Sequence, residues 1–467
     1  MSEQTCDVVV IGAGPAGMRA AVTAANEGLS VTLIDEQTEA GGQIYRAVAR
    51  VARTRPADLT LLGPEYAAGG DIVLELDAAD ITVLHGHTVW QISQDGTVWC
   101  SDGTKAKSIT ARFVIMASGA QERPVPVPGW TLPGVMTAGA AQILLKSAAM
   151  VPDGPVALYG SGPLLLLVAD QLLSAGADIR VVAETTTFKD YLNAAPHLLG
   201  ALPASKYLKK GIALRRHLKA AGVPIIKAPN GVSIEGTERA TGLRIIGKHG
   251  QTFEAETILL QQGVVPNTQA SWQLRLDHAW HAAQHYWYPT TDRFGATSLA
   301  NVFIAGDGAG IFGAEAAAAA GALAGLGVAH AAGNISAAAR DQKALPFIAL
   351  HKKAAAIRPL LDHLFPPPAH ILVPDDATII CRCEEITAGQ VRDAAKLGAP
   401  GPNQLKAFLR AGMGPCQGRM CGLSVVEIMA RAHGKSPAEI GAYRIRPPLK
   451  PLSLAELAAM DDDTPTP

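Results

Sequence analysis

A glycine-rich loop near the N-terminus constrains the fold of this chain more than any other feature. The apolar run at residues 7–11 suits a buried parallel strand, and it gives way to the loop GAGPAG at residues 12–17. A helical stretch follows, and a second apolar strand at residues 31–34 leads to Asp35. A strand, a glycine loop, a helix, a strand and an acid in this order are the context that a dinucleotide-binding unit requires. The sequence therefore predicts such a unit at the start of the chain.

Each glycine of this loop has a physical role. Gly12 permits the tight turn, Gly14 lets a pyrophosphate approach the backbone, and Gly17 lets helix and strand pack closely. The helix N-terminus offers unpaired N–H groups to the phosphates. Asp35 is placed to accept hydrogen bonds from an adenosine ribose.

Three further motifs indicate which dinucleotide is bound. A Gly-Gly-Gln segment follows at residues 41–43, residues 114–120 read VIMASGA, and a short strand within residues 297–307 ends in Gly-Asp. These residues resemble the large glutathione-reductase-like class of flavoproteins with two dinucleotide-binding domains, with Ser118 where that class has threonine. In that class the aspartate of Gly-Asp binds the ribitol of FAD. The FAD-binding residues that the resemblance implies are Gly12, Gly14, Pro15, Ala16, Gly17, Asp35, Glu36, Gly42, Gln43, Ser118, Gly119, Gly306 and Asp307.

A second unit repeats the first further along the chain. An apolar strand at residues 156–159 leads into the loop GSGPLL at residues 160–165, then a helix, then a strand ending in Glu184. Leu165 stands where the third glycine belongs, and a side chain there pushes helix and strand apart. We expect the fold to be kept, with two alternatives for the loop: it binds a second adenine nucleotide, ATP or NAD(P), or it only packs. The residues of this candidate site are Gly160, Gly162 and Glu184.

The cysteines point to a separate redox centre. Cys6 and Cys100 stand alone and are expected to be ordinary small buried residues, which excludes dithiol chemistry with the flavin. Four more cluster near the C-terminus as C-x-C and C-x4-C, namely Cys381, Cys383, Cys416 and Cys421. A [2Fe–2S] cluster needs four thiolates. Zinc needs four as well, but C-x-C is an unusual spacing for one tetrahedral ion, so the spacing favours the cluster.

The residues between these cysteines predict a small helical domain. Thr387 and Gln390 form a capping box, so a helix should start beside Cys383 and stop near residue 398. Further helices are expected over residues 403–411 and 418–432, the last carrying Cys421 in its opening turn. Gly414, Gly418 and Gly422 are expected to leave room for close approach of the backbone to the cluster.

This region is similar to the bacterioferritin-associated-ferredoxin-type domain, although its second pair is spaced by four residues. The motif GMGPCQGRMCG, the tail RPPLKPL, the N-terminal GAGPAG and GGQIYR, LLGPEY at 61–66 and GDGAGIFGAEAA after residue 305 resemble one family in particular. It is the family of FAD subunits of multi-subunit bacterial amine dehydrogenases, which includes the opine oxidase A subunit, the D-hydroxyproline dehydrogenase alpha subunit and the hydrogen cyanide synthase B subunit. The resemblance covers nearly the whole chain.

The predicted architecture is α/β, with two dinucleotide-binding (glutathione-reductase-like) domains and a small all-α C-terminal [2Fe–2S] domain. The expected boundaries are residues 1–127 and 285–345 for the FAD-binding domain, 128–284 for the inserted domain, 346–375 for a linker, 376–434 for the [2Fe–2S] domain and 435–467 for a tail.

The family resemblance implies an electron-transfer subunit. An amine of an opine, hydroxyproline, proline or glycine type would be oxidised on a partner flavin subunit of the D-amino-acid-oxidase type. Electrons would pass, by way of an FMN between subunits, through the cofactors of this chain to an external acceptor, and a small third subunit belongs to the expected complex. No catalytic residue is identified, because no His, Glu or Tyr beside the flavin motifs declares itself as a base.

Two other functions compete with this interpretation. A self-sufficient NAD(P)H-dependent reductase would need the second glycine loop to hold a nicotinamide nucleotide. A non-enzymatic iron–sulfur docking module would have no need of Asp35, Gln43 and Asp307 together.

Composition excludes several partners. A net charge of -1 gives no electrostatic case for nucleic acid or an anionic membrane. The Ala/Gly-rich run at residues 313–332 is expected to be a buried helix and not a transmembrane segment. No export signal is visible, so we expect a cytoplasmic protein, or one peripheral to the membrane through its electron acceptor. His278, His281 and His285 could share a helical face and bind zinc, but a polar surface or interface turn is the favoured interpretation.

Overall fold

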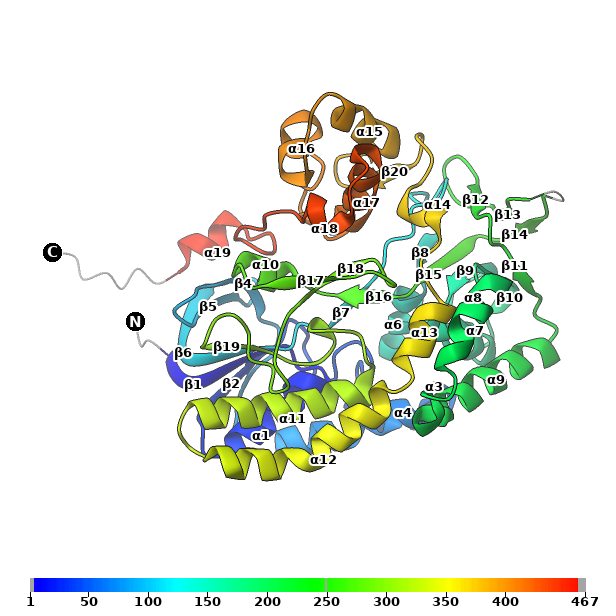
Figure 1. The fold of residues 1–467 in the computed structure, drawn as a ribbon. Helices are drawn as coiled ribbons and strands as arrows, with labels where there is room; N and C mark the ends of the chain where they lie inside the picture. Colours follow the sequence, from blue (N-terminus) through cyan, green and yellow to red (C-terminus); the bar gives the residue numbers. More distant parts are fainter. Residues whose placement is uncertain (1–3, 248–249, 461–467) are drawn as a thin grey trace.

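The computed structural model describes residues 4–247 and 250–460. The first three residues of the expected FAD-binding domain and the last seven of the expected tail lie outside these ranges. An α/β body carries a small helical domain on one side, built from the C-terminal part of the chain (Figure 1).

The first sheet is organised around its N-terminal strand. Its order is β3-β2-β1-β6-β5-β4, and β19 pairs with β6. Strand β1 pairs in parallel with β2 and β6, and its residues 8–10 are fully buried, which is why its second half, residues 8–11, is apolar. The strands are β1 (Gln4–Ile11), β2 (Val31–Ile34), β3 (Thr82–Leu84), β4 (Thr88–Ile92), β5 (Thr97–Ser101), β6 (Ala106–Met116) and β19 (Val302–Ile304).

Two helices cover this sheet in close contact with each other, α1 (Pro15–Asn26) and α11 (Ala314–Ala331). A Cβ on Gly321 would lie 2.0 Å from the carbonyl oxygen of Ala16, so the backbones touch. This packing explains why α11 is rich in alanine and glycine. By length and composition α11 could cross a membrane, yet 67% of it is buried inside the protein. The expected buried helix is confirmed.

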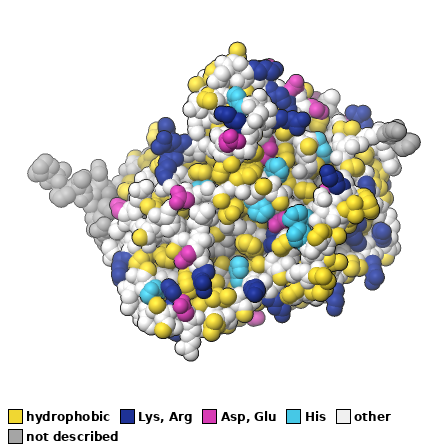
Figure 2. Space-filling view, viewed as in Figure 1, with side chains coloured by type: hydrophobic (Ala, Val, Ile, Leu, Met, Phe, Trp, Pro, Cys, Tyr) yellow, Lys and Arg dark blue, Asp and Glu magenta, His cyan; other side chains and the backbone are white. Residues whose placement is uncertain are grey.

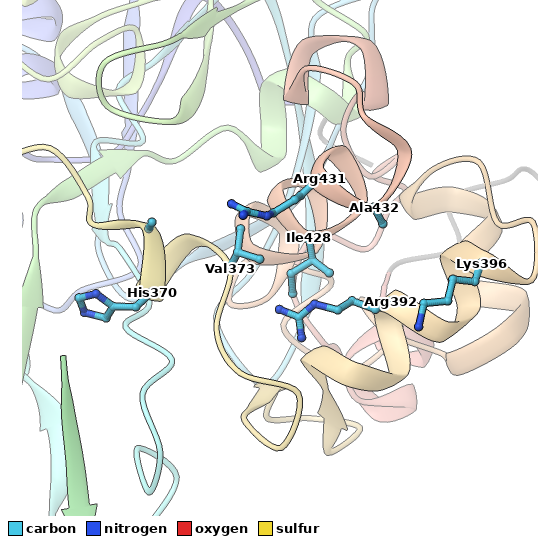
Figure 3. A pocket seen from close by; sticks show the side chains of 8 residues that line it. His370, Val373, Arg392, Lys396, Ile428, Arg431 and Ala432 are labelled. Carbon is cyan, nitrogen blue, oxygen red and sulfur yellow. The ribbon is translucent and has the colours of Figure 1, made fainter. Parts of the chain in front are cut away.

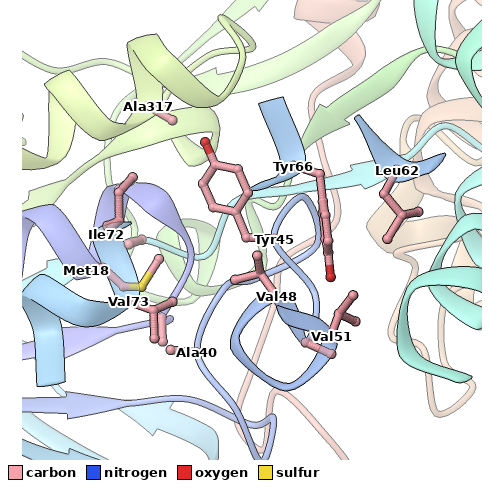
Figure 4. Packing of buried hydrophobic residues seen from close by; sticks show 14 of the residues in the cluster. Met18, Ala40, Tyr45, Val48, Val51, Leu62, Tyr66, Ile72, Val73 and Ala317 are labelled. Atoms are coloured by element: carbon pink, nitrogen blue, oxygen red, sulfur yellow. The ribbon is translucent and has the colours of Figure 1, made fainter. Parts of the chain in front are cut away.

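In the core beside α1, the rings of Tyr45 and Tyr66 pack among aliphatic side chains (Figure 4). The ring of Tyr45 points toward Ala317 of α11 and packs so closely on Gly69 that a Cβ on this glycine would lie 2.3 Å from it. Tyr66 donates a hydrogen bond to the carbonyl oxygen of Arg46 over 2.7 Å. The segment 41–46 is thereby fixed against the core. Other helices of this domain are α2 (Val48–Thr54), α3 (Asp58–Leu62), α4 (Pro64–Ala67), α5 (Gly69–Asp77) and α12 (Ala337–Ala355), with the 3-10 turn η3 (Gly306–Gly308).

The inserted domain repeats the design with its own parallel sheet of order β11-β10-β9-β15-β8. Its strands are β8 (Val135–Thr137), β9 (Pro155–Ser161), β10 (Asp178–Glu184), β11 (Ile225–Lys227) and β15 (Thr257–Gln262), beside the antiparallel β12 (Val232–Glu235), β13 (Gly242–Ile245) and β14 (Thr252–Glu254). Its helices are α6 (Ala138–Ala148), α7 (Pro163–Ser174), α8 (Phe188–Ala194) and α9 (Ser205–Ala220), with the turns η1 (Ala195–His197) and η2 (Leu202–Ala204). Strands β7 (Ala120–Glu122) and β16 (Val264–Pro266) pair with each other where the chain enters and leaves this domain.

The three histidines do not share a helix, so the helical alternative is wrong. The short helix α10 (Gln269–Gln273) is followed by an antiparallel hairpin of β17 (His278–His281) and β18 (Tyr286–Pro289). Cross-strand aromatic pairs, such as Trp280 with Trp287 at 5.2 Å, favour strands over a helix. Histidines gather on the face below the C-terminal domain (Figure 2).

The C-terminal domain is helical apart from a short ladder of two strands that the sequence did not suggest. The capping box of Thr387 and Gln390 is present, which confirms the predicted helix start. The third helix begins at Gly422 and not at Gly418, so Cys421 precedes its first turn as the cap residue. The linker helices are α13 (Arg358–Leu364) and α14 (Ala369–Leu372), and the domain and tail contain β20 (Ile379–Cys381), β21 (Ile386–Thr387), α15 (Ala388–Lys396), α16 (Pro402–Leu409), α17 (Gly422–His433), α18 (Pro437–Ile440) and α19 (Leu454–Ala458).

Candidate functional site

A cavity of about 760 Å³ lies where the three domains meet. Its walls come from the first glycine loop, from α6 and α7 of the inserted domain, and from the C-terminal region. Eleven of the thirteen predicted FAD-binding residues line it. They are Gly12, Gly14, Pro15, Ala16, Asp35, Glu36, Gly42, Gln43, Ser118, Gly119 and Asp307.

The other two predicted residues support this wall from behind. A Cβ on Gly17 would lie 1.7 Å from the carbonyl oxygen of Gly12, and one on Gly306 would lie 2.6 Å from the Cβ of Ala16. Both positions therefore exclude any side chain. Their role in the structure is packing of the loop against the helices and not contact with the cavity.

Asp35 is held in position by backbone donors. Its Oδ2 accepts from Ala13 N at 2.5 Å, and its Oδ1 accepts from Gln37 N at 2.7 Å. The carboxylate is buried at the end of β2, on the cavity wall. This orientation suits a carboxylate that accepts ribose hydroxyl groups.

Asp307, which also lines the cavity, is likewise held by backbone donors. One carboxylate oxygen accepts from Phe312 N at 2.9 Å and from Gly313 N at 3.3 Å, and burial raises the pKa of the carboxyl group. Ser118 donates to the carbonyl oxygen of Asn267 over 3.1 Å, which ties the crossover segment to the end of the inserted domain.

Unpartnered polar atoms at the cavity wall fit a polar ligand. Arg46 Nε and Gln269 Oε1 are buried and have no hydrogen-bond partner among the described residues. Both residues line the cavity. Because a buried unpaired polar atom is costly, these atoms indicate a ligand that supplies the missing partners. The shape and the donor set fit FAD.

Several ionisable residues of the cavity escaped the sequence analysis, among them Lys146 and Glu122. Lys146 Nζ donates to the carbonyl oxygens of Gln43 at 3.2 Å and Ile44 at 3.0 Å, and burial lowers its pKa to about 7. Glu122 accepts from Gly139 N at 2.9 Å at the start of α6, and burial raises the pKa of its carboxyl group. Neither belongs to a glycine motif, so no local sequence signal marked them.

The second glycine loop has different surroundings. None of Gly160, Gly162 and Glu184 lines the cavity of about 760 Å³. Leu165 is fully buried in the core. Glu184 is buried and forms ion pairs with Arg215 and, at 3.0 Å, with Lys227, so its carboxylate is already neutralised.

Polar side chains at this end of the inserted sheet bond to one another and to the linker. Gln262 Nε2 donates to Ser161 Oγ at 2.7 Å and to the carbonyl oxygen of Pro366 at 3.4 Å. Helix α13 packs against α8 beside this edge. The linker of this chain therefore covers part of the surface where a second nucleotide would be expected to bind.

The four clustered cysteines come together as two pairs. Cys421 hydrogen-bonds to Cys381, which lowers the pKa of the Cys381 thiol to about 6, and both side chains are buried. Cys383 contacts Cys416 nearer the surface, where partial burial raises the pKa of the Cys383 thiol. Within residues 4–247 and 250–460 no three metal-ligating side chains converge on one point. Two thiol pairs match two irons that need two thiolates each, so the residues fit a [2Fe–2S] cluster.

Tyr443 explains most of the glycines in this loop. Cβ atoms on Gly412 and Gly418 would lie 2.6 Å and 2.7 Å from its ring, and only Gly414 makes room for a cysteine, Cys383. The Tyr443 hydroxyl group donates to the carbonyl oxygen of Ala411 over 3.0 Å. The Tyr443 ring is thus a structural reason for the glycine at 418, whereas a Cβ on Gly422 would lie in ordinary contact with that ring at 3.4 Å. Close approach of the backbone at Gly418 and Gly422 to the cluster stays a prediction.

Each of the three histidines has its own partner. His278 stacks on Trp272 at 3.6 Å, His281 lies 3.6 Å from an oxygen of Asp362, and His285 is hydrogen-bonded to Glu427 at 2.6 Å. Glu427 belongs to α17, so the hairpin contacts the cluster domain. This contact agrees with the favoured interpretation of an interface turn.

A second cavity, of about 500 Å³, lies between α14 and the cluster domain (Figure 3). Arg392, Lys396 and Arg431 give it a cationic wall, with His370 at its far side. Arg392 and Lys396 are paired with Asp376 and Asp393, so most of this charge is balanced locally.

Comparison with known proteins assigns two regions of the chain to known families. Residues 6–333 match the pyridine nucleotide-disulphide oxidoreductase family, and residues 379–431 match the BFD-like [2Fe-2S] binding domain. The A subunit of opine oxidase from Rhizobium meliloti is 42% identical over an alignment of 467 positions, which covers 97% of this chain and 87% of the relative. The chain belongs to the family of opine oxidase A subunits. This family membership agrees with the motifs quoted above, and FAD and a [2Fe–2S] cluster are its cofactors.

The chain is also similar to more distant relatives over nearly its whole length. Hydrogen cyanide synthase subunit HcnB of Pseudomonas protegens is 30% identical over 97% of this chain and 98% of its own length. The crystal structure of L-proline dehydrogenase from P. horikoshii superposes with a TM-score of 0.70 at 18% identity, over 97% of this chain and 79% of that one, and shows the same fold. The chain is a flavin oxidoreductase subunit with a [2Fe–2S] domain.

Proposed function

We propose that this chain is the electron-transfer subunit of a complex that oxidises an amine of an amino-acid derivative of the opine, hydroxyproline, proline or glycine type. Relatives named as opine oxidase, hydrogen cyanide synthase and sarcosine oxidase subunits support this substrate class. Amine oxidation takes place on a partner flavin subunit of the D-amino-acid-oxidase type. The complex includes a small third subunit and an FMN between subunits, is cytoplasmic, and passes electrons to an external acceptor.

One observation supports the proposed electron transfer between the cofactors: the FAD cavity and the cluster site share part of their lining. Arg419 lies in the loop between Cys416 and Cys421 and also lines the FAD cavity. A flavin takes up two electrons and releases them singly, while an iron–sulfur cluster carries one at a time. A single loop that borders both sites keeps the path between them short.

The contacts of Lys146 and Glu122 favour an electron-transfer role for this cavity, and not a role as the amine-oxidising site. Lys146 donates to two backbone carbonyl groups and, at 2.9 Å, to Gln142. Glu122 is held at the start of α6. A general base for an amine needs a free acceptor within reach of the substrate, and both groups are already engaged in the fold.

Exposed apolar side chains on the inserted domain support assembly with partner subunits. Phe188 and Leu199 are 77% and 79% exposed, and Leu192 lies exposed on the same segment. Exposed apolar patches on soluble proteins commonly mark interaction sites. Co-expression with an amine-oxidising partner, followed by size-exclusion chromatography, tests this assembly; Phe188→Ser with Leu199→Ser should weaken it.

An anaerobic visible spectrum of the purified chain, before and after addition of NADH, separates the relay from a self-sufficient reductase. We expect the flavin and cluster bands to persist with NADH and to bleach with dithionite, because Glu184 is neutralised by Arg215 and Lys227. Rapid bleaching by NADH would instead show that the second glycine loop binds a nicotinamide nucleotide and that the chain is a reductase in its own right.

A further inference from the structure

The segment that follows the cluster domain returns to the FAD-binding domain. We call residues 444–450 the C-terminal strap. Leu449 N donates to the carbonyl oxygen of Trp90 in β4 over 2.7 Å. On its other side, Arg419 Nη1 donates to the carbonyl oxygen of Leu449 over 3.1 Å, and Gln417 bonds to that of Pro448. The strap is thus held between β4 and the cluster loop.

The strap delivers a cation to the FAD cavity. Lys450 lines the cavity and pairs with Glu36, the residue after Asp35. The ammonium group therefore lies at the end of β2, where the ribose-binding acid stands. A positive charge there balances two neighbouring carboxylates beside an anionic ligand.

The cluster loop delivers a second cation. Arg419 lines the same cavity, is half-buried, and has no carboxylate partner among the described residues. Its backbone carbonyl group accepts from Gln121 Nε2 over 3.1 Å, which fixes the loop against β7 at the cavity wall. A half-buried guanidinium group without a carboxylate is suited to an anion such as a pyrophosphate.

We propose that Arg419 and Lys450 are FAD-binding residues, supplied by the cluster loop and by the C-terminal strap. Neither residue belongs to the glycine motifs, and Lys450 lies beyond both matched family regions, residues 6–333 and 379–431. FAD then binds to a site completed by the last part of the chain. This inference rests on the cofactor site and is independent of the amine substrate.

Charge-removing variants of the full-length protein test the proposal. Lys450→Met and Arg419→Met keep most of the aliphatic length and remove the cation. We expect each variant to bind FAD at least about tenfold more weakly, a change of about 1.4 kcal/mol. The readout is fluorescence titration of the FAD-depleted protein with FAD, together with the flavin-to-chain ratio after purification.

Lys435→Met serves as the matched control, because Lys435 lies exposed after α17 and lines neither cavity. It should bind FAD as the parent protein does. Iron and acid-labile sulfide are measured in every variant, so that loss of the domain fold is distinguished from loss of a contact. An FAD affinity within twofold of the parent for both Lys450→Met and Arg419→Met, at full iron content, would overturn the proposal.

Discussion

The two glycine loops of this chain have the same order of elements and opposite surroundings. In the first, Gly17 brings α1 so close that a Cβ would lie 1.7 Å from the carbonyl oxygen of Gly12, and Asp35 faces a cavity of about 760 Å³. In the second, Leu165 is buried in the core at the equivalent point, and Glu184 is paired with two cations. The packing of a dinucleotide-binding unit can thus persist where its ligand chemistry has changed, so a fold alone does not assign a ligand.

We expect the largest effect on FAD binding from a side chain at position 17 of the first loop. The equivalent position of the second loop, Leu165, already carries one. Gly17→Ala places a methyl group against backbone atoms that cannot move without opening the turn, so we expect loss of FAD binding. Flavin content after purification measures this. Gly70→Ala is the control, since a Cβ there would have no atom within 4 Å, and it should keep FAD. Full flavin occupancy in Gly17→Ala would show that the two loops do not differ as described.

The reciprocal change in the second loop should affect stability and not cofactor binding. Leu165→Ala removes a fully buried side chain, and we expect the free energy of unfolding to fall by about 2–5 kcal/mol. Urea unfolding followed by circular dichroism measures it. Flavin occupancy without denaturant should stay at the parent level; selective loss of FAD would contradict the assignment of Leu165 to packing alone.

The inserted domain also contributes Lys146 to the first loop's cavity, with a predictable pH dependence. Burial lowers the pKa of Lys146 from 10.5 to about 7, so the unfolded chain binds more protons between these two pH values. The free energy of unfolding of the FAD-free protein should therefore rise with pH across this window, by at most about 1.4 kcal/mol per pH unit. Lys146→Met should lack this contribution. If the free energy of unfolding changed with pH equally in the parent protein and in Lys146→Met between pH 7.5 and 9.5, this contribution of Lys146 would be refuted.

The smallest effect is expected at the acid of the second loop. Glu184→Gln removes a charge whose partners Arg215 and Lys227 can turn toward solvent, so the free energy of unfolding should fall by about 1 kcal/mol or less. Binding of NADH, measured by calorimetry, should be undetectable in both proteins. If the parent protein bound NADH tightly and Glu184→Gln bound it tenfold more weakly, the second loop would be a nucleotide site. The two loops would then not differ in ligand binding.

Local sequence signals predicted the elements that depend on local chemistry. The strand at residues 31–34, the capping box at Thr387 and the buried helix α11 follow from apolar runs, caps and composition, and the structure has all three. The histidine hairpin was harder, because spacings of three and four fit a helix as well as a turn. In the structure Trp280 and Trp287 pair across a hairpin, and the spacing of the histidines gives no signal for that pairing.

The missed residues share one cause, which is separation along the chain. Lys450 meets Glu36 across 414 positions, and Gln121 meets the loop of Arg419 across 298. No periodicity or motif joins such residues before the domains are folded together. Tyr443 was missed for the same reason, since only its position in space shows why Gly412 and Gly418 must be glycine.

The anchoring of the cluster domain has a consequence for electron flow. Trp130 Nε1 donates to the carbonyl oxygen of Ile379 over 2.6 Å, and Arg382 lies over the Trp130 ring at 5.2 Å, just beside the first two cysteines. The cluster domain thus contacts the rest of the protein at this point, at the hairpin through His285 and Glu427, and at the strap. Three separate contacts of this kind oppose a swinging motion of the domain as a mobile carrier. Under the electron relay proposed above, we therefore expect the rate of electron transfer between the two cofactors to be independent of solvent viscosity.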